Sequence, residues 1–139
     1  MKIATATTAV RYAETDQMGV VYHANYLVWM ELGRTALVES LGLDYAALEA
    51  EGIVSPVIEV QVKFKKPLRY GETATIKTWI DKYDGLRVMY GYEILNSQGD
   101  LCVTGTTVNV CVRKDTFRPV SMKRTCPNWH KAYEQAKHN

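Results

Sequence analysis

The stretch that decides the fold is residues 24–41, ANYLVWMELGRTALVESL. Its apolar and small side chains recur at three- and four-residue spacing, and only three of its residues are charged. An amphipathic surface helix carries a broad polar face, so this composition predicts a helix that is buried on most sides. Gly42 follows and can adopt the left-handed conformation that ends helices. We therefore expect one long central helix over about residues 24–41.

The segments around this helix predict strands. A first strand is expected over residues 4–12, and a short helix from Asp44 to Glu51 is expected before four further strands. Those four segments alternate between apolar and polar residues and are separated by turn-forming residues; they cover 57–66, 73–80, 86–95 and 101–113. A helical tail is expected from about residue 127, where Pro127 suits the first helical turn. Tight turns join antiparallel strands, so these strands predict an antiparallel sheet.

This order of elements predicts an α+β fold in which an antiparallel sheet wraps around one long central helix, a hotdog-like layout. The sheet and the helix each cover the apolar face of the other. The chain is expected to form a single domain over residues 1–139. The strand over 57–66 has a charged outer face and exposed edges, which favours pairing between copies. We expect a homo-oligomer, either a dimer or a dimer of dimers and thus a homotetramer.

Composition excludes several classes of function. The net charge is only +2, from 17 basic and 15 acidic residues, which argues against a nucleic-acid partner. No apolar run is long enough to span a bilayer, so no membrane association is expected. The N-terminal segment lacks the apolar core of a secretory signal, which favours a cytoplasmic location. Cys102, Cys111 and Cys126 are odd in number and lack CxxC spacing, so neither a disulfide framework nor a zinc site is expected, and no metal is predicted.

The segment that enters the helix, residues 13–26 (AETDQMGVVYHANY), is the candidate site. Asp16 lies seven residues before His23, and Gly19 lets the chain turn between them. A helix N-terminus offers unpaired N–H groups and a partial positive charge, which suits an oxyanion. Val20, Val21 and Tyr22 are expected to form dry walls that strengthen charge interactions. A carboxylate that faces such N–H groups is suited to acyl transfer.

Structural alternatives remain open for each polar residue here. Asp16 can instead form a local Asx turn or a helix cap. At His23 the backbone N–H, and not the imidazole, is the expected functional group. Glu31 either pairs with Arg34 at i,i+3 spacing or points into a pocket. Glu14 is expected to face solvent if Asp16 points inward.

Basic residues cluster in VKFKKPLR, residues 62–69. They form either a solvated strand edge or a contact for a phosphorylated ligand.

Two stretches resemble a known family. Residues 12–35 (YAETDQMGVVYHANYLVWMELGRT) resemble the signature of the 4-hydroxybenzoyl-CoA thioesterase-like branch of the hotdog superfamily, which includes the Tol-Pal-associated acyl-CoA thioesterases. Residues 62–72 (VKFKKPLRYGE) are similar to the second-strand signature of that branch. With the element order, the resemblance covers nearly the whole chain except about the last fifteen residues. The chain departs from the 4-hydroxybenzoyl enzymes at His23-Ala24, where they carry an aromatic residue and a proline, and at Glu31, where they carry an aspartate.

The resemblance implies an acyl-CoA thioesterase. It implies that Asp16 is the catalytic carboxylate, as nucleophile or as general base, and that the backbone amide of His23 polarises the thioester carbonyl. Coenzyme A would be part of the substrate, so no cofactor is expected. The expected substrate-binding residues lie in the opening loop, on the helix and near the CoA phosphates: Gly19, Val20, Val21, Tyr22, Glu31, Lys65 and Arg87.

Two other functions stay open. One is a non-catalytic acyl-CoA-binding module that has kept the pocket. The other is a hotdog hydratase or dehydratase, which would need a histidine paired with an acid near the acyl β-carbon. His23, His130 and His138 are the only histidines, and two of them lie in the tail. The choice between aromatic and aliphatic acyl groups is also open.

Overall fold

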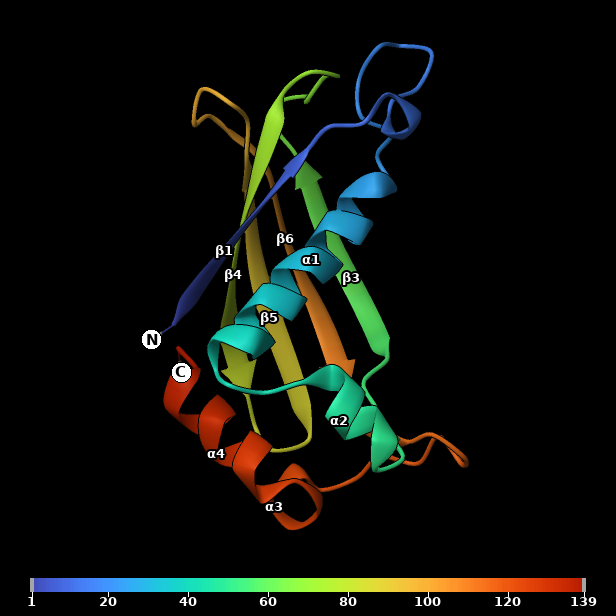
Figure 1. Cartoon of the computed structure of the whole chain (residues 1–139), viewed down its shortest axis with the longest axis vertical. Helices are drawn as coiled ribbons and strands as arrows, with labels where there is room; N and C mark the ends of the chain where they lie inside the picture. Colours follow the sequence, from blue (N-terminus) through green and yellow to red (C-terminus); the bar gives the residue numbers. More distant parts are fainter. Residues whose placement is uncertain (1, 139) are drawn as a thin grey trace.

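The computed structural model describes residues 2–138. Its main feature is a five-stranded antiparallel sheet with the strand order β1-β4-β5-β6-β3 (Figure 1). The strands are β1 (Ile3–Ala9), β3 (Val57–Phe64), β4 (Thr73–Tyr83), β5 (Arg87–Leu95) and β6 (Leu101–Val110). The predicted antiparallel sheet is therefore confirmed.

Alternation along the central strands directs one set of side chains toward the helix. On β5 the buried alternate positions are Val88, Tyr90, Tyr92 and Ile94, as the alternating pattern predicted. β4 behaves in the same way from Ala74 to Ile80, where every second residue is buried, and after an irregularity between Ile80 and Lys82 the buried position falls on Tyr83. Side chains on a strand point to opposite faces in turn, so these two strands supply most of the sheet's contribution to the core.

Helix α1 (Asn25–Ser40) packs across the sheet over β1 and β4 and reaches β5 (Figure 1). It buries Tyr26, Trp29, Met30, Gly33, Leu37 and Val38. The expected helix over about 24–41 is confirmed to within a residue at each end, and Gly42 has the left-handed φ of 76° that the C-terminal stop requires.

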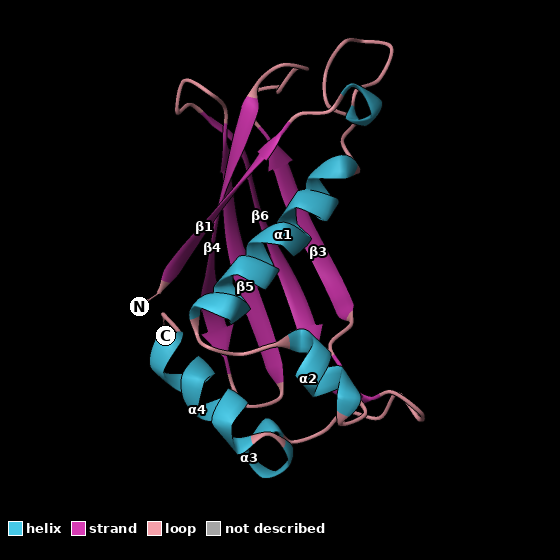
Figure 2. Ribbon diagram, in the orientation of Figure 1, coloured by secondary structure: helices cyan, strands magenta, loops and turns pink. Residues whose placement is uncertain are grey.

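Three further helices accompany α1, so the helical part is more than one long helix. Helix α2 (Tyr45–Ala50) begins where the Asp44 side chain accepts a hydrogen bond from Ala46 N at 2.9 Å, as predicted. Helices α3 (Met122–Thr125) and α4 (Pro127–Ala136) close one end of the sheet (Figure 2). The tail helix was predicted from about residue 127, whereas α3 was not. No helix within residues 2–138 is long and apolar enough to cross a membrane.

Two predicted strands leave the main sheet earlier than the sequence pattern indicates, and a third, predicted over 57–66, ends at Phe64. The first strand ends at Ala9, and a 3₁₀ turn, η1 (Tyr12–Glu14), follows it. The last strand is interrupted at Cys111, and its continuation β7 (Val112–Arg113) pairs instead with β2 (Ile53–Val54) in a separate two-stranded sheet. In both cases the chain leaves the main sheet to bind another segment, which an alternating pattern alone does not reveal.

Strand β3 forms one edge of the sheet. Nearly all of its residues are exposed, including Val60 and Phe64 on the face that continues the apolar side of the sheet. The opposite edge, β1, is formed by the first described residues of the chain and packs against α1. The free apolar edge therefore lies along β3.

Candidate active site

The loop between η1 and α1 folds as a tight turn that carries Asp16. The turn is closed by hydrogen bonds from Asp16 N to Val20 O and from Gly19 N to Asp16 O, both 2.9 Å long. Gly19 has a φ of 78°, a conformation that costs glycine little and other residues more. The predicted turn at Gly19 is therefore confirmed, and it brings Val20 and Val21 back toward α1.

Asp16 has one carboxylate oxygen engaged locally and one available. Its Oδ1 accepts a hydrogen bond from Met18 N at 2.8 Å, which is the Asx turn that the sequence left open. Its Oδ2 has no hydrogen-bond donor among residues 2–138. Asp16 also lines a surface hollow of about 270 Å³. Asp16 can therefore form the Asx turn through Oδ1 and still present Oδ2 to a ligand in the hollow.

The same hollow is lined by His23, at the entrance to α1. Within the described part of the chain the backbone N–H of His23 donates to no acceptor, so it is available to a ligand. It immediately precedes Ala24, the N-cap of a 16-residue helix, where the helix dipole adds partial positive charge. The two residues predicted to be catalytic, Asp16 and His23, therefore line the same hollow.

The walls of the hollow are mainly apolar and aromatic. Val21 and Tyr26 are buried, and the ring of Phe64 lies 5.7 Å from that of Tyr26 and 6.2 Å from the imidazole of His23. The hollow is lined by Asp16, Met18, Val20, Val21, His23, Tyr26, Phe64, Lys65, Lys66 and Pro67. Apolar walls lower the local dielectric and strengthen interactions of the two polar groups with a bound carbonyl.

Lysines from the end of β3 lie at the rim of the hollow. Lys66 forms an ion pair with Asp100 at 2.7 Å. Lys65 has no acidic partner within residues 2–138, so its charge is available to an anionic ligand. Of the basic cluster in residues 62–69, Lys65 is therefore the side chain that fits the predicted phosphate contact best.

Four predicted binding residues do not line this hollow. Gly19 shapes the turn without lining it, and Tyr22 is 46% exposed, with its ring 4.5 Å from the imidazole of His23. Glu31 is exposed on α1 and is not paired with Arg34, which instead donates a hydrogen bond to Tyr92 Oη at 3.0 Å. Neither alternative for Glu31, the ion pair or the pocket, is therefore realised in the single chain.

Arg87 is the fourth of these residues. It lines a different hollow, of about 450 Å³, together with residues at the end of β4, the β4–β5 turn, the start of β3, and β5 and β6: Ile58, Glu59, Lys82, Tyr83, Asp84, Met89 and Val108. The start and the end of β3 are separated by the length of the strand, so one chain does not bring Arg87 to the hollow of Asp16.

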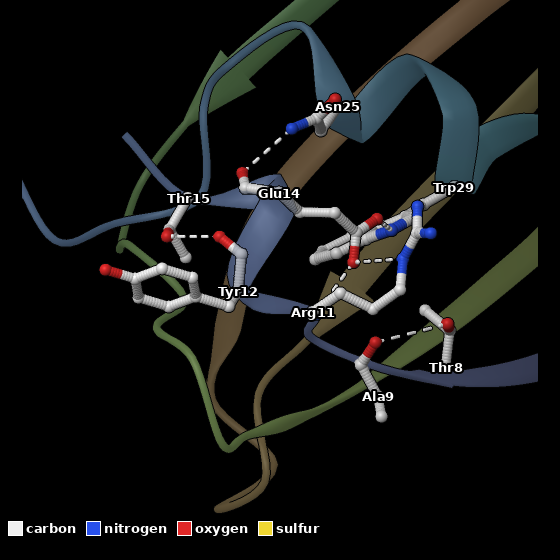
Figure 3. Close-up of polar contacts among 8 residues, drawn as sticks. All are labelled: Thr8, Ala9, Arg11, Tyr12, Glu14, Thr15, Asn25 and Trp29. Atoms are coloured by element: carbon white, nitrogen blue, oxygen red, sulfur yellow. Dashed lines mark hydrogen bonds and ion pairs between the residues drawn. The ribbon is translucent and has the colours of Figure 1, made fainter. Parts of the chain in front are cut away.

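Glu14 is the residue that sequence reasoning placed wrongly. It is 5% exposed, not solvent-facing, and its carboxylate is held by Arg11 and Trp29 (Figure 3). Burial would raise the pKa of Glu14, but hydrogen bonds from the Arg11 backbone and the Trp29 indole, with the Arg11 charge, lower it below its ordinary value. Its partner Trp29 lies 15 positions away on α1, so local sequence carries no signal for the contact.

The described residues offer no centre for metal or thiol chemistry. No group of three or more His, Cys, Asp or Glu side chains within residues 2–138 could hold a metal ion. Cys102, Cys111 and Cys126 are all buried and free. Burial raises the pKa of the Cys111 thiol to about 11, and it also raises the pKa values of Cys102 and Cys126, which disfavours the nucleophilic thiolate.

Comparison with known proteins places this geometry in a family. The chain is 51% identical over 137 residues to a Bacillus subtilis protein described as a candidate acyl-CoA thioesterase, YneP, with 99% of each chain covered. The crystal structure of a DHNA-CoA thioesterase from Staphylococcus aureus superposes with a TM-score of 0.95 at 44% identity, covering 97% of this chain and 91% of that one. A 1,4-dihydroxy-2-naphthoyl-CoA hydrolase from Thermosynechococcus vestitus is 28% identical over 124 residues, covering 88% of this chain and 85% of its own.

The family assignment follows from the extent of these matches. The sequence pattern of the Thioesterase-like superfamily matches residues 10–129, which includes the turn of Asp16, all of α1 and the whole sheet except β1. Membership of the branch that includes the Tol-Pal-associated enzymes stays a prediction. The hotdog superfamily anticipated from residues 12–35 and 62–72 is confirmed, and the chain belongs to the Thioesterase-like superfamily.

Proposed function

We propose that this protein hydrolyses the thioester of an acyl-CoA to the free acid and coenzyme A. The observation that supports the proposal is the hollow at the entrance to α1 that both Asp16 and His23 line, because one Asp16 carboxylate oxygen and the His23 N–H have no hydrogen-bond partner among residues 2–138. The family and the thioesterase relatives support the same reaction. Hydrolysis of a thioester needs a donor for the carbonyl oxygen and a group that attacks or activates water, and this hollow holds one of each.

The His23 N–H would donate to the thioester carbonyl oxygen. As the carbonyl carbon becomes tetrahedral, negative charge develops on that oxygen, and the amide and the α1 dipole stabilise it. Removing one such donor typically costs ~10²–10³ in turnover. The apolar walls formed by Val21, Tyr26 and Phe64 would exclude water from the acyl group and strengthen this interaction.

Asp16 would act in one of two ways. As a nucleophile, its free oxygen bonds to the carbonyl carbon, the C–S bond breaks with release of the CoA thiolate, and water then hydrolyses the mixed anhydride. As a general base, it takes a proton from water while the water oxygen bonds to the carbonyl carbon and the thiolate leaves. In multiple turnovers in ¹⁸O-labelled water, ¹⁸O in the Asp16 side chain would establish the nucleophilic route, because attack of water on the Asp16 carbonyl of the anhydride transfers a water oxygen to Asp16 and the general-base route never does.

We infer that an aromatic acyl group is the first substrate to test. Two relatives act, by their names, on DHNA-CoA or on 1,4-dihydroxy-2-naphthoyl-CoA. The aromatic rings of Tyr26 and Phe64 in the walls can stack against a flat acyl group. The CoA phosphates would lie near Lys65, at the rim of the same hollow.

The decisive experiment is a thiol-release assay with a panel of acyl-CoAs that includes 1,4-dihydroxy-2-naphthoyl-CoA, benzoyl-CoA and straight-chain acyl-CoAs. Hydrolysis releases free CoA thiol, which a chromogenic disulfide detects. A hydratase or dehydratase would change the acyl group without releasing thiol, and a binding module would do neither. Absence of thiol release from every member of the panel would reject the proposed function.

A further inference from the structure

Glu14 is a buried carboxylate that the proposed chemistry does not use directly. We propose that Glu14 is a positioning residue, which fixes the Asp16 carboxylate and the His23 amide relative to each other. The inference rests on the proposed function, because it concerns the same hollow. It depends on four hydrogen bonds that join three separate pieces of chain: the end of the first strand region, the opening loop and α1. Figure 3 draws the three that involve Arg11, Asn25 and Trp29.

The backbone carbonyl of Glu14 binds residues on both sides of His23 in the sequence. Its carbonyl oxygen accepts hydrogen bonds from Tyr22 N and from Asn25 Nδ2, each 2.8 Å long. Tyr22 and Asn25 flank residues 23 and 24, so this one carbonyl sets where the His23 peptide lies. Asp16 is only two residues from Glu14 along the chain, and its own turn is closed internally. The position of the turn relative to α1 therefore depends on the peptide of Glu14.

The side chain of Glu14 anchors that peptide. Its Oε1 accepts from Arg11 N at 2.8 Å, and its Oε2 accepts from Trp29 Nε1 at 2.8 Å in a buried contact. The Arg11 guanidinium adds an ion pair at 3.4 Å. Hydrogen bonds to an ionised acceptor are stronger than neutral ones, and a buried donor left without a partner is costly. The carboxylate thus fixes η1 to the second turn of α1.

The chemistry of the contact requires a carboxylate and not an amide. Both oxygens of Glu14 accept from N–H donors. Glutamine has one acceptor oxygen and one NH₂ group, so in Glu14→Gln one N–H donor must face another donor. The variant keeps the size of the side chain, and we expect the mismatch to shift η1 relative to α1. Misplacement by about 1 Å can lower turnover by about 10²-fold.

The first test compares Glu14→Gln with Glu39→Gln, a matched change at an exposed acid on the last turns of α1. Steady-state kinetics are measured at a temperature at which circular dichroism shows both variants fully folded. We expect kcat of Glu14→Gln to fall about 10- to 100-fold with KM changed less than about threefold, and Glu39→Gln to match wild type. If Glu14 served stability alone, the folded Glu14→Gln protein would retain the wild-type kcat, which would overturn the inference.

A second variant protects the test against misfolding. Trp29→Phe removes the indole donor and keeps the aromatic packing, so we expect a smaller loss of kcat. In Glu14→Gln/Trp29→Phe the glutamine NH₂ no longer faces the indole N–H, and kcat should recover several-fold relative to Glu14→Gln alone. A double variant no more active than Glu14→Gln would contradict the proposed role of the Trp29 contact.

NMR separates failure of this inference from failure of the proposed function. In ¹H–¹⁵N spectra of the complete protein, Glu14→Gln should shift the Trp29 indole signal and the backbone signals of Asp16 and His23, whereas Glu39→Gln should leave them in place. If wild type hydrolyses no acyl-CoA, the proposed function fails while these shifts still support Glu14 as the residue that positions the pair. Unshifted Asp16 and His23 signals would overturn the positioning role whatever the activity.

Discussion

Asp16 is the residue on which the proposed reaction depends most directly. Asp16→Asn keeps the size of the side chain and the Oδ1 acceptor for Met18 N, so the turn should survive. The variant removes the negative charge and the basicity, and we expect kcat to fall by about 10²–10⁴-fold, the usual contribution of such a group. Thiol release measures the loss, and an unchanged melting temperature shows that the fold is intact. Turnover within threefold of wild type would remove Asp16 from the mechanism.

Glu14 should contribute to the pH dependence of stability. Its pKa is lowered in the folded chain from the ordinary value of 4.5, so folding favours its ionised form. The stabilisation is fully present above the unfolded pKa and is lost as the pH falls through the folded pKa. Melting temperatures between pH 7 and pH 3 should therefore fall less steeply for Glu14→Gln than for wild type. Parallel curves for the two proteins would contradict the assigned pKa direction.

Sequence reasoning at the residue scale succeeds where the relevant contacts are local. Asp16, Gly19 and His23 lie within eight consecutive positions, and turn and helix-terminus chemistry predicts their arrangement. It fails for Glu14, because alternation between inward and outward side chains does not hold in an irregular loop. Its environment is decided by Trp29, which only the packing of α1 brings near.

Close packing between α1 and β4 depends on Gly33. A methyl group added at Gly33 would overlap the hydroxyl of Thr78 and would stand 2.9 Å from Ile76 Cγ2. Alanine favours the helix over glycine by roughly 0.5–1 kcal/mol, whereas overpacking costs about 1–3 kcal/mol, so Gly33→Ala should lower the free energy of unfolding. Urea denaturation measures the change.

A double-mutant cycle tests the cause. Thr78→Ala removes the overlapping hydroxyl, so Gly33→Ala/Thr78→Ala should be more stable than the sum of the two single changes by about 1 kcal/mol. Strict additivity would show that the contact with Thr78 does not limit the helix. Gly33 thus affects the packing of two elements: the absence of a side chain allows α1 to approach β4 closely.

At the scale of elements, periodicity predicts what is long and regular. α1 and the buried face of β5 match their patterns because each is decided by its own sequence spacing. The break at Cys111 and the 3₁₀ turn at Tyr12–Glu14 were not predicted by periodicity, because each depends on a distant segment. Val112 pairs with Val54 after the break, and Val10 N donates a hydrogen bond to Glu72 O before the turn. The residues at which these strands end are therefore determined by tertiary contacts, and sequence periodicity alone does not fix them.

The whole molecule presents an unpaired strand edge at β3, and we expect copies to associate there. Val60 at 41% and Phe64 at 56% exposure add apolar area to the unpaired backbone groups of the edge, and pairing with a second copy would cover both. Light scattering coupled to size exclusion should give a dimer or a multiple of it. Val60→Lys should shift the protein toward monomer, while Leu86→Lys, at the exposed β4–β5 turn, should not. A wild-type monomer at micromolar concentration would rule out this association.

The start of β1 and the end of α4 lie side by side, at the end of the sheet opposite the loop between η1 and α1 (Figure 1). Lys2 N donates to Ala136 O at 3.3 Å, and His138 N donates to Ile80 O at 3.0 Å. A linker of a few residues can therefore join them, and new ends can be opened at the exposed turn near Asp115. Such a circular permutant should fold with its hollow unchanged, because none of the residues that line the hollow lies near either the joint or the cut.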